Sequence, residues 1–288
     1  MLIPTFEVTP KLHKEQLESL RFQLLTPAHG QLIKHSVRIS CEGKVKALYL
    51  KSEAADGADK PIKDISYKAA LRALQLMRFN PASNSRRSAV DKNSSGGDLV
   101  LGWMDAGRPP REDIFRAGHR DYFPVAMWLV PLLKDFEQAF QKHLPEYWQF
   151  HLEQAKRLVR PPAEKLQTLH RVADLHERQM LAQWDQTRYY HFPGTEAFST
   201  LTLNHNVVFL AHQDGNNVPN TLSCLAAFGS YARGALCLPR LGVSFDLKPG
   251  DLLIADTNEE YHGTVGQPFG NRYSVVAYLH GSLIPRSG

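Results

Sequence analysis

The chain has 288 residues, of which 43% are hydrophobic and 22% are charged, with three cysteines and a formal net charge of +5. A chain of this length buries a sizeable core, and we expect a single domain over residues 1–288. Three scattered cysteines exclude a disulfide framework and a Cys-x-x-Cys zinc site. No run approaches the about 18 apolar residues of a membrane span, so we expect a soluble, intracellular, monomeric protein without a membrane partner.

The positive charge is unevenly distributed along the chain. Residues 1–195 hold 29 Lys and Arg against 22 Asp and Glu, whereas residues 196–288 hold 5 against 7. Within the first part, residues 60–92 carry eight cations against Asp64 and Asp91 only. Such a segment either follows a nucleic-acid phosphate backbone, with Arg86 and Arg87 as the candidate contacts, or is an ordinary solvated surface.

The first two thirds of the chain predict helices. Residues 65–77 place apolar side chains among helix formers at helical spacing, and Pro81 and the polar stretch 83–97 predict a long loop after them. Residues 128–144 show the same spacing up to Pro145, and two more helices are predicted at about 146–160 and 163–183. We therefore expect residues 1–195 to form a mainly helical, basic extension with loops.

From Ala197 the pattern changes to alternating and β-branched runs. Strands are predicted over residues 198–204, 207–211, 243–247, 251–255 and 273–279, with a tight turn at Pro249-Gly250. The expected fold class is α+β, with helices packed around an antiparallel β-sandwich or barrel. Residues 196–288 would be the C-terminal part of this core, carrying the functional site.

Two imidazoles and one carboxylate in the β-rich part have the character of a metal site. His212 and Asp214 form a His-x-Asp pair, His262 follows, and Arg272 comes ten residues later inside a strand-like run. Two histidines and one carboxylate on one face of Fe(II) leave positions open for a bidentate oxo acid and for O2. A strand arginine offers a fixed fork to the far carboxylate of that acid. The set predicts an Fe(II)- and 2-oxoglutarate-dependent oxygenase with these four residues as its catalytic group.

A second His-x-Asp pair competes with the first. His119-Arg-Asp121 precedes the helical block, and we interpret it as structural. A kinase reading of His-Arg-Asp is excluded because the sequence lacks the glycine-rich loop, the strand lysine and the Asp-Phe-Gly motif that it requires.

Strand periodicity gathers further polar side chains on one face. Arg272, Ser274, Tyr278 and His280 share one parity. Polar groups are costly to bury without partners, so this row predicts a pocket. Taken alone, Tyr278 and His280 would be read as a buried aromatic residue and a satisfied core histidine.

Several motifs between residues 194 and 280 carry a resemblance to a known family. They are Phe198-Ser-Thr-Leu-Thr-Leu-Asn204, Ala211-His-Gln-Asp-Gly-Asn-Asn217, Gly234-Ala-Leu-Cys-Leu-Pro239, Pro249-Gly-Asp251, His262 and Asn271-Arg-Tyr-Ser274, with a weaker match at residues 96–105. They resemble the TET/J-binding-protein (TET/JBP) family of Fe(II)/2-oxoglutarate dioxygenases, which oxidise the 5-methyl group of pyrimidines in DNA. The resemblance implies a double-stranded β-helix (jelly-roll, cupin-like) core with flanking helices.

The resemblance also implies which residues hold the cofactors. His212, Asp214 and His262 would bind Fe(II), and Arg272 with Ser274 would hold the carboxylate of 2-oxoglutarate. O2 would be the other co-substrate.

Substrate contacts follow from the same resemblance. Asn217 and His280 fall where the family contacts the edge of cytosine, and Tyr278 falls where an aromatic ring stacks on the flipped base. Thr202 matches a threonine that packs against that ring. Gln213 departs from the Arg or Lys that many members carry between the metal His and Asp, so no side-chain contact is carried over there.

The leading hypothesis is a DNA dioxygenase that converts 5-methylcytosine to 5-hydroxymethylcytosine, and on to the formyl and carboxyl forms, on a flipped base. The alternatives are thymine hydroxylation in DNA, or a 2-oxoglutarate hydroxylase of a protein or small molecule. The latter shares the triad and Arg272 but requires neither Tyr278 nor His280. A non-catalytic β-sandwich module is a third class, and the complete triad speaks against it.

Overall fold

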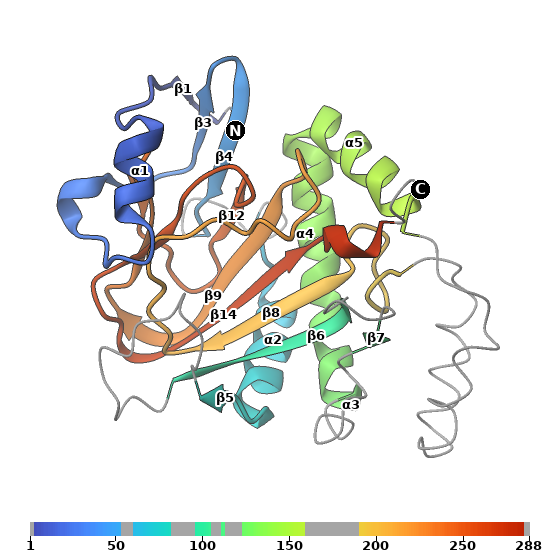
Figure 1. Ribbon diagram of the computed structural model, residues 1–288. Coiled ribbons are helices and arrows are strands. Elements are labelled where there is room, and N and C mark those ends of the chain that lie inside the picture. Colours follow the sequence, from blue (N-terminus) through green and yellow to red (C-terminus); the bar gives the residue numbers. More distant parts are fainter. Residues whose placement is uncertain are drawn as a thin grey trace.

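Two β-sheets packed face to face form the centre of the molecule (Figure 1). The computed structural model describes residues 3–52, 60–81, 96–104, 111–112, 123–158 and 190–284. The major sheet has the order β1 (Thr5–Glu7), β3 (Val37–Cys41), β4 (Lys44–Leu50), β12 (Leu252–Ala255), β9 (Ser223–Ala232), β14 (Phe269–Tyr278), β8 (Thr200–His205), β6 (Gly97–Met104) and β5 (Asn80–Pro81), with β7 (Arg111–Glu112) paired to β6. The minor sheet has the order β13 (Gly263–Val265), β10 (Ala235–Leu238), β11 (Val243–Phe245) and β2 (Gln31–Ile33).

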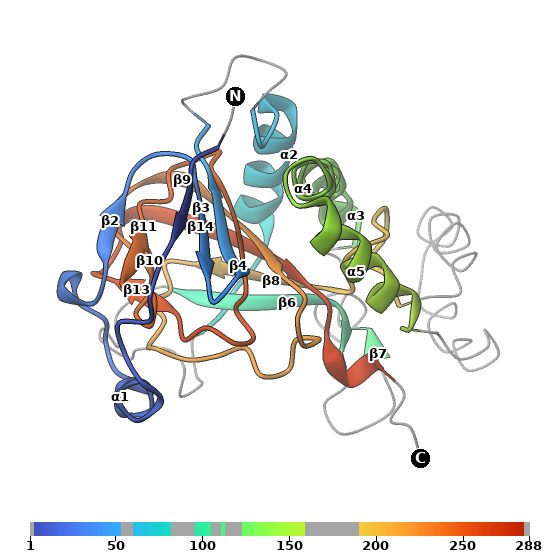
Figure 2. The same cartoon turned by 90° about the horizontal axis from the view of Figure 1, so that it is seen from above.

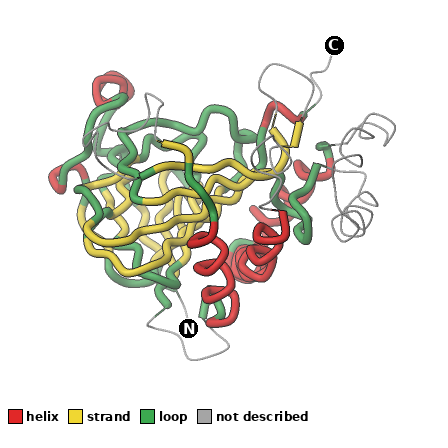
Figure 3. Tube along the Cα trace, turned by 90° about the horizontal axis from the view of Figure 1, so that it is seen from below, coloured by secondary structure: helices red, strands yellow, loops and turns green. Residues whose placement is uncertain are grey.

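All the helices except α1 lie on the outer face of the major sheet, and the minor sheet covers its inner face (Figure 2). The helices are α1 (Lys14–Leu20), α2 (Asp64–Leu76), α3 (Phe123–Ala126), α4 (Val130–His143) and α5 (Pro145–Lys156), with 3-10 turns η1 (Pro27–His29), η5 (Met127–Leu129) and η7 (Gly281–Leu283). Seen from below, most of the helical segments lie on one side of the strands (Figure 3). None of the described helices has the length and apolarity that a membrane span needs.

Strand alternation separates two hydrophobic clusters. Phe228 of β9 faces the helices, where Tyr67 of α2 stacks on it with ring centroids 5.2 Å apart. Its neighbour Ala227 faces the minor sheet and packs with residues such as Phe245. Because successive side chains of a strand point to opposite faces, one face of the major sheet packs on the helices and the other faces the minor sheet. The α+β fold with a double-stranded β-helix core is therefore confirmed.

The prediction of a mainly helical segment over residues 1–195 is wrong for residues 31–50, and β1 and β6 are further strands within it. Strand β4 pairs antiparallel with β12, and β2 pairs parallel with β11, so this segment completes both sheets. Strands β3 and β4 form a hairpin whose loop residues Glu42 and Gly43 have φ of 55° and 74°. Both positive values belong to a type I′ turn, in which Asn-Gly or Asp-Gly is the usual signal. Glu-Gly is a weaker signal, which is why the hairpin was missed.

Four of the five strands predicted in the C-terminal part correspond to β8, β11, β12 and β14, whereas the segment 207–211 differs and β9, β10 and β13 were not predicted. Residues 207–211 form no strand, since Ala211 exchanges backbone hydrogen bonds with Phe22 and Gln23 of the N-terminal loop instead. Strand β9 was not predicted, because it is buried on both faces and its Cys-Leu-Ala-Ala-Phe run lacks alternation. The predicted helices at 65–77, 128–144 and 146–160 correspond to α2, α4 and α5, and the one at 163–183 lies outside the described residues.

Helix α5 carries a buried histidine, His151, in the hydrophobic cluster between the helices and the major sheet. His151 is fully buried between the rings of Phe140, Trp148 and Phe198, and its Nε2 donates a hydrogen bond to the carbonyl of Ala197 at 2.6 Å. Burial lowers the pKa of His151 from 6.5 to about 4. The folded protein therefore holds this ring neutral near neutral pH.

The stability of the protein should fall as the pH drops from about 6.5 to about 4, because the unfolded chain binds the His151 proton first. Between pH 7 and pH 5 we expect the free energy of unfolding to decrease by about 2 kcal/mol through this residue. Urea unfolding of the wild type and of His151→Leu at both pH values measures the difference. An equal loss in both proteins would contradict the assignment.

Candidate active site

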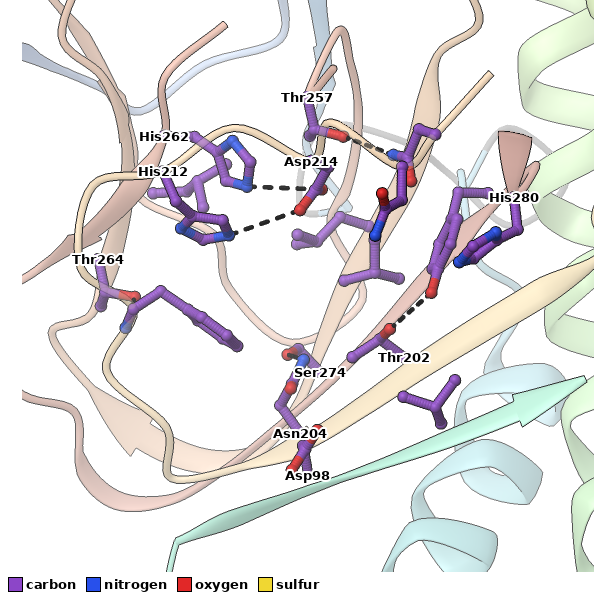
Figure 4. A pocket seen from close by; sticks show the side chains of 18 of the residues that line it. Asp98, Thr202, Asn204, His212, Asp214, Thr257, His262, Thr264, Ser274 and His280 are labelled. Carbon is purple, nitrogen blue, oxygen red and sulfur yellow. Dashed lines mark hydrogen bonds and ion pairs between the residues drawn. The ribbon is translucent and has the colours of Figure 1, made fainter. Parts of the chain in front are cut away.

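A cavity of about 310 Å³ lies between the two sheets and is lined by residues between Asp98 and His280 (Figure 4). Its walls come from β6, β8, β9, β10, β13 and β14 and from the loops around residues 209–217 and 257–262. All nine residues predicted for metal, co-substrate and base line it: Thr202, His212, Asp214, Asn217, His262, Arg272, Ser274, Tyr278 and His280.

His212, Asp214 and His262 meet at one end of the cavity. The backbones of His212 and His262 form an antiparallel bridge, with N–H to O distances of 3.0 and 2.8 Å, and their ring centroids lie 4.3 Å apart. The two carboxylate oxygens of Asp214 lie 3.5 Å from His212 Nε2 and 3.6 Å from His262 Nε2. One donor atom from each residue lies within 4.8 Å of the others, so the three could hold one metal ion.

Hydrogen bonds behind the three residues orient their donor atoms. His212 Nδ1 donates to the carbonyl of Leu210 at 2.7 Å, and His262 Nδ1 donates to the carbonyl of Glu260 at 3.1 Å. With Nδ1 occupied by a backbone carbonyl, Nε2 of each ring faces Asp214 and is the atom that would bind a metal ion, as in metal-binding histidines. Burial opposes ionisation of Asp214, but His262, His212 and the Thr257 hydroxyl outweigh it and hold its pKa well below the usual range. This donor set suits Fe(II).

Arg272 presents a buried cation to the same cavity. Its side chain is buried, and among the described residues its Nε has no hydrogen-bond partner. Burial lowers the pKa of Arg272, and its guanidinium lies 5.6 Å from the centre of the Tyr231 ring. A buried cation without a carboxylate is costly, so an anionic ligand in the cavity fits it.

Ser274 lies two residues further along β14 on the same face. Its hydroxyl accepts a hydrogen bond from the Asn204 amide at 3.2 Å, while the Asn204 carbonyl oxygen is buried without a partner among the described residues. The arginine and this polar pair together fit the carboxylate of 2-oxoglutarate.

Thr202, Tyr278 and His280 lie together in the cavity, and Figure 4 shows Thr202 and His280 on the side away from the candidate metal ligands. The hydroxyls of Thr202 and Tyr278 lie 3.2 Å apart, and the rings of Tyr278 and His280 have centroids 6.3 Å apart. Asn217 is bridged to His280 through the backbone, and its amide NH2 donates to the hydroxyls of Ser223 and Thr257 at 3.2 Å.

Some lining residues were missed by the sequence prediction. Asp98 and Val100 of β6 line the floor beside Asn204 and Thr202, their partners in β8. Their alternation within the Gly96–Gly102 segment was the available signal. Thr257, which bonds to both Asp214 and Asn217, lies in a turn that carries no sequence signal.

The basic segment is only partly described, because Arg86, Arg87 and Lys92 lie outside the described residues. Its described part includes α2, which packs on the face of the major sheet opposite the cavity. There Lys60 pairs with Asp64 at 2.8 Å. These two side chains therefore do not flank the cavity.

Comparison with known proteins shows to which family the chain belongs. Residues 109–281, well over half of the sequence, match the Tet_JBP family, the oxygenase domain of the 2OGFeDO superfamily. The chain belongs to this family. Its superfamily uses Fe(II), 2-oxoglutarate and O2, so the predicted cofactors are confirmed.

Individual relatives share part of the chain. It is 25% identical over 219 residues to thymine dioxygenase JBP1 of Trypanosoma brucei brucei, a match covering 73% of this chain and 22% of that protein. It is 36% identical over 99 residues to the bifunctional helicase and thymine dioxygenase JBP2 of Leishmania infantum, covering 33% and 9%. The chain thus spans less than a quarter of the length of these relatives. Among solved structures, NgTET1 in complex with 5mC DNA is 13% identical, with 95% of this chain and 93% of that chain covered and a TM-score of 0.49.

Replacing any one of His212, Asp214 or His262 by Ala should abolish turnover, because three donors hold the ion together. Anaerobic titration with Fe(II) should show its affinity lowered at least about 10-fold. His119→Ala, in the other His-x-Asp pair, is the control and should change neither. Full activity in any of the three variants would overturn the assignment.

Proposed function

We propose that this protein is an Fe(II)- and 2-oxoglutarate-dependent dioxygenase that oxidises the 5-methyl group of a pyrimidine in DNA, with 5-methylcytosine as the preferred base. The carrying observation is one cavity that holds the His212–Asp214–His262 group together with a second group, Tyr278, His280 and Asn217, of which Asn217 adjoins the first group through Thr257. A hydroxylase of a small molecule would use the first group but has no need of the second.

The first group, together with Arg272 and Ser274, would position the reactants. When bound, Fe(II) supplies the activation of O2, coupled to the oxidation of 2-oxoglutarate to succinate and CO2, that hydroxylation of a methyl group needs. Arg272 and Ser274 would hold the far carboxylate and so orient the co-substrate. Leu225, Leu236 and Val276 line the cavity with apolar surface and exclude water from the reacting methyl group.

The second group would receive a base turned out of the duplex, because a methyl group within stacked DNA cannot reach a buried site. The Tyr278 ring would stack on the base, and its hydroxyl is held by Thr202. Since the amide NH2 of Asn217 already donates to Ser223 and Thr257, its carbonyl oxygen is the atom left to meet the base. A carbonyl accepts from the amino group of cytosine but gains nothing from the carbonyl of thymine, which supports 5-methylcytosine.

Thymine in DNA is the second candidate substrate. The relatives of this chain in Trypanosoma and Leishmania carry the name thymine dioxygenase, and their identity to it is 25% to 36% over the matched residues. The two pyrimidines share the 5-methyl group and differ at the edge that Asn217 and His280 would read.

Matched duplex oligonucleotides with a single 5-methylcytosine, or with thymine at the same position, distinguish these substrates. Incubation with Fe(II) and 2-oxoglutarate, followed by mass spectrometry of the nucleosides, should yield 5-hydroxymethylcytosine and then the formyl and carboxyl forms. Asp214→Ala is the inactive control. Equal rates on both bases would contradict the preference, and no product from either would contradict the function.

His280→Ala should reduce the rate on 5-methylcytosine because it removes a contact to the base edge. A contact of this kind is worth about 1–3 kcal/mol, so kcat/KM should fall roughly 5- to 150-fold. The rate of uncoupled 2-oxoglutarate turnover without DNA, which does not involve the base, is the internal control. A His280→Ala variant that oxidises 5-methylcytosine as fast as wild type would remove His280 from the proposed site.

Thr202→Val should shift the products toward 5-hydroxymethylcytosine. The 3.2 Å contact between the Thr202 and Tyr278 hydroxyls fixes the ring that would hold the base, and the later oxidation steps need the already oxidised carbon held close. Tyr278→Phe keeps the ring, loses the same contact and should give the same shift. If both variants lose every step equally, Thr202 is ordinary strand packing.

A further inference from the structure

A buried lysine of the N-terminal strand β4 lies behind the candidate metal ligands. Lys46 is 3% exposed, and its Nζ lies 2.8 Å from an Asp256 carboxylate oxygen and 2.6 Å from one of Glu259. Burial alone would lower the pKa of Lys46, but its hydrogen bonds to Asp256 and Glu259 outweigh burial and raise it. The backbone is tied as well, since the Asp256 N–H donates to the Lys46 carbonyl at 3.0 Å.

The turn that Lys46 holds, residues 256–260, supports two of the three candidate ligands. The Asp214 N–H donates to the Thr257 carbonyl at 2.9 Å, and the Thr257 hydroxyl bonds to the Asp214 carboxylate. The Glu260 carbonyl accepts from His262 Nδ1 at 3.1 Å. A shift of this turn would therefore move a carboxylate and an imidazole relative to each other.

A second cation, Arg240, binds the last residue of the same turn. Arg240 makes a bidentate contact with Glu260, whose side chain is fully buried, and the Lys46 Nζ lies 3.8 Å from the same carboxylate. The turn thus carries three carboxylates, Asp256, Glu259 and Glu260, against two cations. Losing Lys46 would leave Asp256 buried beside other carboxylates without its counter-charge.

We propose that Lys46 is a positioning residue for the metal site: by clamping the 256–260 turn, it sets the distance and orientation of Asp214 and His262, which makes β4 part of the active site. This inference rests on the ligand assignment in the proposed function. It predicts an effect on metal affinity beyond any effect on stability, because hydrogen-bonded residues behind metal ligands tune their affinity.

The same strand offers a matched control. Lys51, directly after the end of β4, is also buried, and its Nζ lies 3.1 Å from Asp251, at the opposite end of β12 from Asp256. Five residues of strand separate the two lysines by about 17 Å. The Lys51 pair supports the Lys248–Asp251 turn, which contacts none of the candidate ligands.

The test compares the double variant Lys46→Met/Asp256→Asn with Lys51→Met/Asp251→Asn. Removing both partners of a pair leaves no unpaired buried charge, so both variants are designed to fold. Co(II), which takes Fe(II) sites and has visible absorption, is titrated into the metal-free protein without DNA, and thermal unfolding of the metal-free protein is recorded alongside. We expect the Lys46 variant to bind Co(II) about 10- to 100-fold more weakly and the Lys51 variant to bind as the wild type does.

Two results would overturn the proposal: a folded Lys46 variant that binds Co(II) as tightly as the wild type, or an equal loss in both variants. His262→Ala separates this failure from a failure of the ligand assignment. If His262→Ala also binds Co(II) like the wild type, the assignment itself is wrong. If His262→Ala loses Co(II) while the Lys46 variant retains it, only the role of Lys46 is wrong.

Discussion

The reciprocal backbone hydrogen bonds between His212 and His262 hold two distant parts of the chain in one register. They place the two imidazoles side by side, and Asp214, two residues beyond His212, then reaches both Nε2 atoms. The side chains contribute little to this pairing, because the backbone groups make it. The geometry of the candidate metal centre therefore depends on how the loop before residue 212 and the turn before residue 262 are supported.

That support comes from the sheets on either side. The outer face of the major sheet is filled by apolar contacts with α2, α4 and α5, which anchor β8, β9 and β14. Their inner face can then carry polar side chains that would be unfavourable in a packed core. Arg272 and Asn204 keep buried polar atoms without partners among the described residues, as expected of a face shaped for a ligand.

The N-terminal segment supports the candidate metal ligands, a role that its sequence did not predict. Strands β2 and β4 extend the minor and major sheets, and residues 22–23 hold Ala211, next to His212. Lys46 adds a charged tie to the turn before His262. The candidate ligands are thus braced from both sides by residues that lie far before them in the chain.

The sequence by itself determined the features that neighbouring residues encode. The His-x-Asp spacing predicted the pairing of His212 with Asp214, strand parity predicted that Arg272, Ser274 and Tyr278 share a wall, and helical spacing predicted α2, α4 and α5. Such patterns repeat within a few residues, so local chemistry is enough to recognise them.

Only the tertiary structure decided the rest. It showed residues 31–50 as strands, residues 207–211 as a loop, and Lys46 and Thr257 beside the candidate ligands. The reason is that strand pairing and buried ion pairs join residues that are distant in the chain. The local pattern of a single sequence does not indicate which distant residue will be the partner. A strand buried on both faces, such as β9, also loses the alternation that would reveal it.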